Sequence, residues 1–424
     1  QIRTSRDVRS ADRYTLTAMM MHKIKILSRI ALLMSALSFC VSPCAAREDG
    51  DGGCELVAKR LLEAGYANVR YASDDDVIVF TIENDSYKLP AEGFARACRI
   101  VEGAELPLDK KVEIIGTHRH IPELTLSYSP RTGVWHATRR LDEGWDMVKD
   151  KEMHASSLGK VDIVIYPQIS LKNLIINQVY QSLWQLNPAL EVSLWPGMKF
   201  TYQLTLPIYN DGYGALSSKV HPGFVTLSQS FRDPWHLNIS GKLTAGAFSA
   251  NRFGVALEML YFFPNERFSL DTQLGMLANS YWDGFRFHYS KEPYFRWNVA
   301  ANYYCPPLGT QFSLRLQKFL LGDVGLKYEM IRHFRHCSAG LYAEKASQAQ
   351  LNVGFRFQIA LPPYNQRRRG YIPRVRTSGQ MGMSYNANNE QYYYKEFRTE
   401  ASDNIMSKNQ FSPYFIESQL NFVH

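Results

Sequence analysis

The chain has 424 residues, of which 45% are hydrophobic and 21% are charged, a composition that excludes a largely disordered protein. Its net charge of +8 comes mostly from the first 46 residues, since the rest carries 41 positive against 38 negative charges and gives no reason to expect a nucleic-acid partner. Aromatic residues make up 13% of the chain, which favours strands.

The first 46 residues resemble an upstream stretch followed by a secretory signal peptide. Basic residues over 23–29 precede an apolar run over 30–41, and small residues follow at 42–46. This order is typical of an export signal, and it predicts cleavage after Ala46. The apolar run is too short to span a bilayer comfortably. Lipidation of Cys44 is an alternative, although Pro43 directly before it fits that motif poorly.

Export implies an oxidising compartment, in which cysteines can pair. Four cysteines follow Ala46, and two of them, Cys54 and Cys98, lie in the same short region. We therefore expect a disulfide between Cys54 and Cys98. No Cys or His spacing suggests a metal site, and we expect no cofactor.

Residues 47–130 predict a small α+β module. Helical spacing over 54–63 and 91–103 alternates with pairs of strands at 67–72 and 76–83, then at 111–118 and 121–128. The triplet at 118–120, His-Arg-His, is interpreted as a polar hairpin turn, since nothing near it completes a metal site. The charged residues over 131–160 predict a linker.

From residue 161 onward, apolar and polar residues alternate in segments of about ten residues, the length of a tilted membrane strand. In "LNVGFRFQIALP" (351–362), Phe355 and Phe357 alternate with Arg356 and Gln358. Successive side chains of a strand point to opposite faces, so each segment has one apolar and one polar face. The same alternation occurs at 199–208, 267–276, 284–289, 311–317 and 324–330.

Aromatic residues gather at the ends of these segments, as in the girdles of membrane barrels, and charged residues on the polar faces require water. We therefore predict a mainly β fold: a transmembrane antiparallel β-barrel of roughly 12–16 strands over 161–424, preceded by the module in the periplasm. The final stretch "FIESQLNFVH" (415–424) is interpreted as the last strand. A soluble β-sandwich is the alternative.

The polar faces predict a lumen that offers hydrogen bonds and charges to a glycan, including uronic or phosphorylated sugars. These side chains would otherwise simply fill and solvate the barrel interior. A Tyr cluster at 392–394 in a long loop offers a stacking surface for sugars, and the Arg run at 367–369 is interpreted as a solvated loop. The lumen candidates are Gln203, Lys242, Asp271, Gln273, Arg286, Arg315, Gln317, Lys327, Glu329, Arg356 and Gln358.

Three stretches resemble the YjbH-like family of exopolysaccharide- and capsule-associated outer-membrane proteins. They are "LLEAGYANVRYASDDDVIVFTIENDSYKLP" (61–90), "YNDGYGALSSKVHPGFVTLSQSFR" (209–232) and "LQKFLLGDVGLKYEMIRHFRHCSAGLYAEK" (316–345). The resemblance implies a Gram-negative outer-membrane barrel that takes part in exopolysaccharide or group 4 capsule secretion. It implies outer-membrane lipid, surface polysaccharide and other export proteins as partners. It supplies no catalytic residue.

Two other functions are weighed against polysaccharide secretion. A general porin fits the polar lumen but does not need a periplasmic module. A hydrolase acting on lipid or glycan needs a nucleophile with a base, and no Gly-x-Ser-x-Gly motif supports one, so we expect a protein without enzymatic activity. The candidates for such chemistry are Ser228, Ser230, Asp233, His236 and His288.

Overall fold

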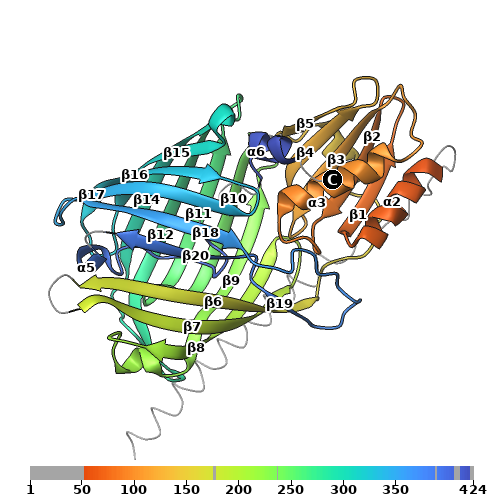
Figure 1. Cartoon of the computed structure of the whole chain (residues 1–424). Coiled ribbons are helices and arrows are strands. Elements are labelled where there is room, and N and C mark those ends of the chain that lie inside the picture. Colours follow the sequence, from red (N-terminus) through yellow and green to blue (C-terminus); the bar gives the residue numbers. More distant parts are fainter. Residues whose placement is uncertain (1–51, 175–177, 236, 387–388, 405–410, 421–424) are drawn as a thin grey trace, which may run out of the picture. The chain divides into compact units, whose positions relative to one another are not determined.

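The computed structural model describes residues 52–174, 178–235, 237–386, 389–404 and 411–420 (Figure 1). The leader, with Ala46 and Cys44, and His236 lie outside these residues. Two sheets account for most of the described chain, one of five strands and one of fifteen. The predicted mainly β fold is confirmed. Within the described residues, no helix is long and apolar enough to cross a membrane.

The five-stranded sheet forms the core of the module, in the order β1-β2-β3-β4-β5. β2 and β3 pair in parallel, because α3 carries the chain across between them, and the other pairs are antiparallel. The helices and strands predicted over 54–128 are present. The elements are α2 (Gly52–Ala64), β1 (Ala67–Ser73), β2 (Val77–Glu83), α3 (Pro90–Glu102), β3 (Lys111–His118), β4 (Ile121–Ser129), β5 (Val134–Thr138) and α4 (Glu143–Val148).

The prediction of a linker over 131–160 is wrong, because this stretch contains β5 and α4. Asp142 caps α4 by accepting a hydrogen bond from the Gly144 backbone N–H at 3.2 Å. Val148 is fully buried in a small core against β2 and β3. The charges of this stretch therefore cover the solvated side of a packed helix.

The predicted disulfide between Cys54 and Cys98 is not formed in the structure. Both are thiols buried in the module core, together with Leu61 and Phe94. Burial raises the pKa of the Cys98 thiol well above its usual range, which disfavours the thiolate that disulfide exchange requires. Here the two cysteines act as small apolar core residues.

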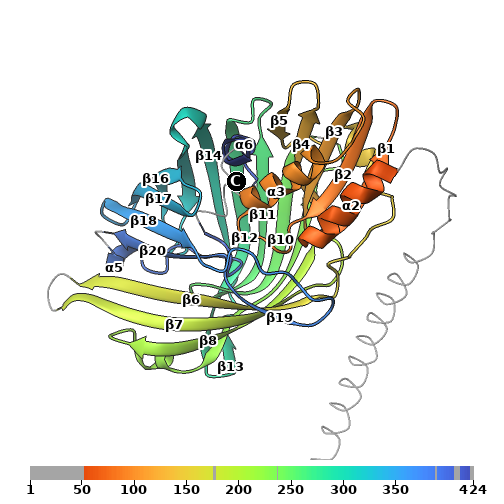
Figure 2. The same ribbon diagram turned by 45° about the vertical axis from the view of Figure 1, so that its right-hand side comes forward.

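The large sheet is a curved meander in which most neighbours along the chain pair antiparallel (Figures 1 and 2). Its strands are β6 (Val161–Leu174), β7 (Gln178–Ser193), β8 (Met198–Asn210), β9 (His221–Arg232), β10 (Ile239–Phe248), β11 (Arg252–Phe262), β12 (Phe268–Asp283), β13 (Arg286–Tyr289), β14 (Tyr294–Cys305), β15 (Thr310–Lys318), β16 (Val324–His333), β17 (Cys337–Ala346), β18 (Asn352–Ala360), β19 (Arg374–Thr377) and β20 (Gln380–Asn386). Two short 3-10 helices, η1 (Ala215–Ser218) and η2 (Pro306–Leu308), lie in its turns.

The two ends of the large sheet are held by one stretch of chain. β19 pairs in parallel with β6, the first strand, and β20 pairs antiparallel with β18, the last strand of the meander. Only Ser378 and Gly379 separate β19 from β20. The Ser378 N–H donates to the Ile165 carbonyl at 2.8 Å, and the Leu361 N–H donates to the Gly379 carbonyl at 3.0 Å. This stretch therefore hydrogen-bonds to both ends of the meander.

The large sheet is polar on one face and apolar on the other, as the alternation predicts. On β16, Lys327 and Glu329 are each 2% exposed, while Leu326 and Tyr328 are 50% and 45% exposed. We call the face that carries Lys327 the inner face and the opposite one the outer face. The pattern recurs on β8 and β18, so the usual distribution of a water-soluble core is inverted here.

The chain leaves β20 through α5 (Asn389–Tyr392), and residues 393–404 then run along the inner face of the sheet. We call residues 389–404 the inner segment. The chain ends in α6 (Pro413–Leu420), so the prediction of a final strand over 415–424 is wrong. Ile416 is fully buried in the module core, and the Glu417 carboxylate accepts a hydrogen bond from the Ala137 N–H at 3.1 Å. α6 thus packs on the module, and Tyr414 and Phe415 in its first turn also contact Tyr304 and His333 of the large sheet.

Candidate functional site

A polar cavity of about 750 Å³ lies on the inner face of the large sheet. Its walls come from strands around the sheet, from the inner segment and from the β2–α3 and β3–β4 connections of the module. Charged side chains of both signs line it, so the cavity is organised by ion pairs rather than by apolar packing.

The inner segment begins with two lysine–carboxylate contacts. Lys395 Nζ lies 2.6 Å from the Asp323 carboxylate, in the β15–β16 turn. The Glu396 carboxylate accepts from Lys327 Nζ at 2.8 and 2.9 Å and from the Gln317 amide at 2.9 Å. Because Lys327 is 2% exposed, its charge depends on this partner and on Glu344, 3.4 Å away.

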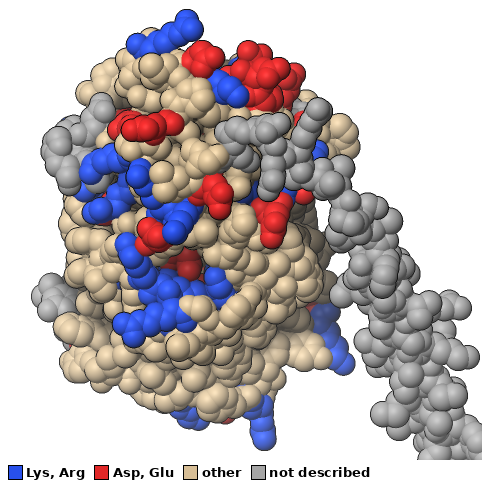
Figure 3. All heavy atoms as spheres, turned by 90° about the vertical axis from the view of Figure 1, so that its right-hand side faces the viewer, with Lys and Arg blue, Asp and Glu red and all other residues tan. Residues whose placement is uncertain are grey.

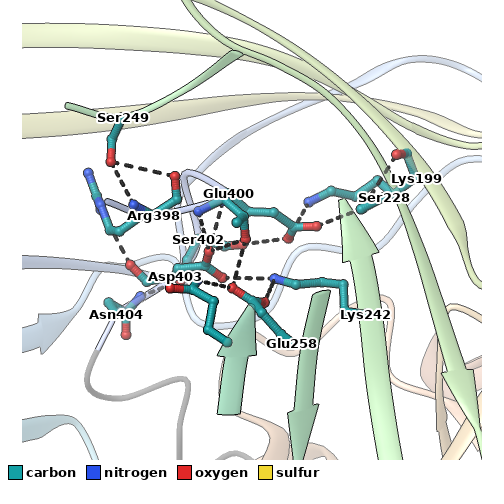
Figure 4. Close-up of polar contacts among 12 residues, drawn as sticks. Lys199, Ser228, Lys242, Ser249, Glu258, Arg398, Glu400, Ser402, Asp403 and Asn404 are labelled. Atoms are coloured by element: carbon teal, nitrogen blue, oxygen red, sulfur yellow. Dashed lines mark hydrogen bonds and ion pairs between the residues drawn. The ribbon is translucent and has the colours of Figure 1, made fainter. Parts of the chain in front are cut away.

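Glu400 is the most highly connected carboxylate of the inner segment (Figure 4). Its oxygens accept from both Nη atoms of Arg119 at 3.1 and 2.8 Å and from the Ser228 hydroxyl at 2.7 Å. Lys199 Nζ of β8 lies 3.3 Å away. The carboxylate is 2% exposed, so it compensates two cations that have little water around them.

Asp403 shapes the turn that presents Glu400. One oxygen of Asp403 accepts from the backbone N–H groups of Thr399 and Glu400 at 3.1 and 2.8 Å. The other lies 3.3 Å from Lys242 Nζ, which also contacts Glu258 at 2.8 Å (Figure 4). The Arg398 backbone N–H donates to the Ser249 hydroxyl at 2.7 Å. The inner segment is therefore tied to three separate regions of the sheet.

The module contributes Arg119 to this network through its β3–β4 turn. Arg119 and His120 adopt positive φ angles of 52° and 66°, as the two central residues of a tight hairpin do. The hairpin interpretation of residues 118–120 is thus confirmed. The sequence pattern did not predict that the Arg119 side chain contacts Glu400. Burial alone would lower the pKa of Arg119, and the Glu400 charge holds it above its usual value.

The structure places seven of the eleven lumen candidates on the cavity wall: Lys242, Asp271, Gln273, Arg315, Lys327, Glu329 and Arg356. They form further pairs, with Arg315 3.2 Å from Asp271 and Arg356 3.1 Å from Glu329. Gln203 and Gln317 are buried on the inner face beside the cavity. Gln358 lies on the same face of β18 as Arg356, outside the cavity wall.

The prediction for Arg286 is wrong. Arg286 is exposed at the start of β13, a short strand that pairs only with the end of β12 and follows a turn at Gly284. The hairpin extends past the cavity, so alternation no longer distinguishes a lumen from bulk solvent there.

The hydrolase candidates are not brought together. Ser228 donates to Glu400, Ser230 lies on the cavity wall, and Asp233 accepts from two backbone N–H groups of its own turn. The His288 ring stacks on Tyr281, with ring centroids 4.7 Å apart. His236 lies outside the described residues. Among the described residues, no cluster of three or more His, Cys, Asp or Glu is arranged to hold a metal ion.

The Tyr cluster at 392–394 is only partly available to a sugar. Tyr392 donates to the Gln350 carbonyl at 2.7 Å and packs edge-on against Phe319, so it anchors the inner segment. Tyr394 is 43% exposed, and its ring centroid lies 4.1 Å from that of Tyr393. Of the Arg run at 367–369, Arg368 is buried in ion pairs, which contradicts the interpretation of a solvated loop at that position.

His120 gives the module a pH dependence that can be measured. Its Nε2 lies 3.0 Å from the Ser157 hydroxyl, and burial, followed by the charges of Arg70 and Lys160, lowers its pKa to about 4. A lowered folded-state pKa contributes stability that is present above the unfolded value of about 6.5 and is lost as the pH falls through about 4.

We expect hydrogen-exchange protection of β3 and β4 to fall by about 1–2 kcal/mol between pH 7 and 4 in the detergent-solubilised chain, after discounting for solvent screening. His120→Asn should reduce this slope, since Asn also adopts positive φ, while His118, whose pKa burial lowers to about 3, contributes in the same direction in both proteins. Burial raises the pKa of the neighbouring Glu83, which acts in the opposite direction in both proteins. Equal slopes in the two proteins would show that His120 is not the cause.

No protein-family model and no curated protein matches the chain. Among solved structures, the chain is similar to a loop L8 deletion mutant of OmpT, an outer membrane protein of Vibrio cholerae, at 9% identity. That match covers 47% of this chain and 87% of the other, with a TM-score of 0.24. A likeness this slight bears on neither the fold nor the function.

Proposed function

We propose that the chain is an outer-membrane β-barrel protein that takes part in the secretion or assembly of a surface polysaccharide. In this proposal the large sheet is the membrane-spanning barrel, closed through β19 and β20, and the module lies in the periplasm. The proposal rests on one observation above all, the inverted distribution of polar and apolar residues across the large sheet.

An inverted sheet needs two different solvents. Large apolar side chains on the outer face, such as Leu314, Leu341 and Phe355, are 53%, 57% and 52% exposed. Buried cations and carboxylates lie on the inner face instead. In water this arrangement would expose a far larger apolar surface than soluble monomers carry, whereas lipid outside and a polar interior satisfy both faces.

Pairing of the backbone supports the same proposal. An open sheet edge cannot lie in hydrocarbon, because its N–H and C=O groups would lack partners. The strands at the two ends of the sheet order, β19 and β20, belong to one continuous stretch that hydrogen-bonds to β6 and to β18. Such a stretch covers part of each free edge that a lipid-facing sheet must avoid.

The polysaccharide part of the proposal comes from the resemblance to YjbH-like proteins and is supported by the chemistry of the cavity. Carboxylate, guanidinium, amide and hydroxyl groups line it, and these are the groups that hydrogen-bond sugar hydroxyls. We propose no catalytic role, because the described serine and histidine candidates do not contact one another.

Cell fractionation together with deletion of the coding region tests this function. A tagged chain should sediment with outer membranes and require detergent for extraction, and its deletion should reduce surface polysaccharide. Recovery of the purified chain as a detergent-free soluble monomer would contradict the barrel. Outer-membrane localisation with unchanged surface polysaccharide would contradict only the glycan role.

A general porin is the second candidate, and the inner segment argues against it. Residues 393–404 occupy part of the inner space and are tied to the sheet by buried ion pairs. We expect liposomes that contain the intact chain to swell in small sugars no faster than protein-free liposomes. Replacing residues 393–404 with a Gly-Ser linker should increase the swelling rate. Equally fast swelling with the intact chain would favour the porin.

A further inference from the structure

Two arginines and two carboxylates form a closed network where the module meets the start of the large sheet. Arg368 lies 3.1 Å from Asp85 and 2.6 Å from Asp162. Arg374 lies 2.8 Å and 2.9 Å from the same two carboxylates. Each carboxylate thus serves two arginines, and the four charges balance.

Three more cations lie beside this network: Arg376, which shares Asp162 with the other two arginines, and two lysines. Arg376 approaches only Asp162, at 3.4 Å, and its buried Nε makes no hydrogen bond. Lys88 donates to the Leu361 carbonyl at 3.0 Å and to the Thr377 hydroxyl, both uncharged acceptors. Lys160 lies over the Tyr371 ring at 5.9 Å. Among the described residues, neither lysine has a carboxylate within ion-pair distance. We call Lys88, Lys160 and Arg376 the basic rim.

The basic rim belongs to the cavity, since all three side chains line it. Figure 3 shows Lys and Arg side chains gathered around a hollow in the face that it draws, with acidic atoms deeper inside. Burial, and then the nearby Arg376 charge, lowers the pKa of Lys88 to about 8, as happens to a cation that lacks a counter-charge. Glu83, another carboxylate of the cavity lining, accepts hydrogen bonds from the Asn68 amide and the His120 N–H.

We propose that the basic rim binds the carboxylate or phosphate group of an acidic glycan at this side of the cavity. The proposal rests on the function proposed above and specifies its substrate as an anionic rather than a neutral polysaccharide. Two ammonium groups and a guanidinium that line the same cavity offer the charge-assisted hydrogen bonds that such a group accepts. Ser157, Tyr166 and Gln380 also line the cavity and supply neutral partners for sugar hydroxyls.

The position of the basic rim favours a glycan over a lipid headgroup. Its three residues face the polar cavity, whereas the apolar surface that lipid would cover is on the opposite face of the sheet. A headgroup at this site would have to draw its acyl chains away from that apolar surface.

Binding of fluorescent tri-galacturonate to the full chain in dodecyl maltoside tests the proposal, with maltotriose as the neutral probe and inorganic phosphate as competitor. We expect salt-sensitive binding of tri-galacturonate, little binding of maltotriose, and competition by phosphate. Lys88→Gln with Lys160→Gln should weaken binding about tenfold or more, because two charged contacts are lost.

Two matched variants separate charge from folding. Lys88→Arg with Lys160→Arg keeps both charges and should retain binding. Lys59→Gln with Arg131→Gln removes the same charge from exposed positions of the module and should also leave binding unchanged. The proposal is overturned if the intact chain binds neither tri-galacturonate nor phosphate, or if the Gln variant at the basic rim binds as well as this control.

Binding measurements in nanodiscs distinguish an acidic glycan from a lipid headgroup as the anion at the basic rim. In nanodiscs, the affinity for tri-galacturonate should be similar in phosphatidylcholine and in mixtures with phosphatidylglycerol. Loss of tri-galacturonate binding by the intact chain in the phosphatidylglycerol mixtures, with binding retained in phosphatidylcholine alone, would assign the rim to a lipid headgroup instead. Failure here is distinguishable from failure of the proposed function: surface polysaccharide would still fall on deletion, but no charge-dependent binding would be found.

Discussion

Replacement of Glu400 with glutamine is expected to lower the free energy of unfolding of the detergent-solubilised chain by about 3–5 kcal/mol. The side chains of Arg119 and Lys199 are 10% and 9% exposed, and Glu400 is the carboxylate that both contact. Glutamine keeps the size of the side chain but leaves two buried cations less compensated, which is the costly way to break a buried ion pair. Denaturant titration followed by tryptophan fluorescence measures the change.

Ser402→Ala is the matched control, because the Ser402 hydroxyl donates to the same carboxylate at 3.3 Å without carrying charge. It should cost about 1 kcal/mol. A double-mutant cycle that combines Glu400→Gln with Arg119→Gln should give a coupling energy of about 1–3 kcal/mol between Arg119 and Glu400. Additive losses, or a loss for Glu400→Gln no larger than that of Ser402→Ala, would show that the network does not hold the inner segment.

The faces of the large sheet could be predicted from the sequence because their signal is local. Strand residues alternate with a period of two, so Arg356 and Gln358 fall on one side and Phe355 and Phe357 on the other wherever the strand lies. The alternation fails at Arg286, where the strand extends past the cavity. The alternation of residues along a strand does not indicate where the cavity ends.

The inner segment could not be predicted in this way. Its residues show no period, and their partners are distant in sequence, as with Glu400 and Arg119, which are 281 residues apart. One indirect signal was present. The inner faces carry Lys199, Lys242 and Lys327, and buried cations need counter-charges, which the acidic residues of the supposed loop supply.

The last helix shows how one pattern can fit two structures. Ile416 and Leu420 are four residues apart, a spacing that places two residues on one face of a strand and also on one face of a helix. Tertiary packing decides between them, since Ile416 enters the module core. With so short a segment, periodicity could not distinguish the two.

Phe357→Arg is expected to destabilise the chain by about 2–4 kcal/mol in a bilayer or detergent micelle, if the outer face lies in lipid. Phe357 is 43% exposed on β18, between Ala339 and Met383 of the neighbouring strands. In a soluble protein, replacing an exposed phenylalanine with arginine would change stability little, because the new charge would be hydrated. The size of the stability change caused by Phe357→Arg therefore shows whether lipid or water covers the outer face.

Leu108→Arg provides the comparison in water. Leu108 is 71% exposed in the module, so the same gain of charge should change the free energy of unfolding by no more than about 0.5 kcal/mol. Urea titration of both variants after folding into lipid vesicles gives the two values side by side. Equal, small changes in the free energy of unfolding of the two variants would place the outer face in water and contradict the proposed membrane barrel. A large loss of stability confined to Phe357→Arg would place the outer face in hydrocarbon, where the arginine charge is not hydrated.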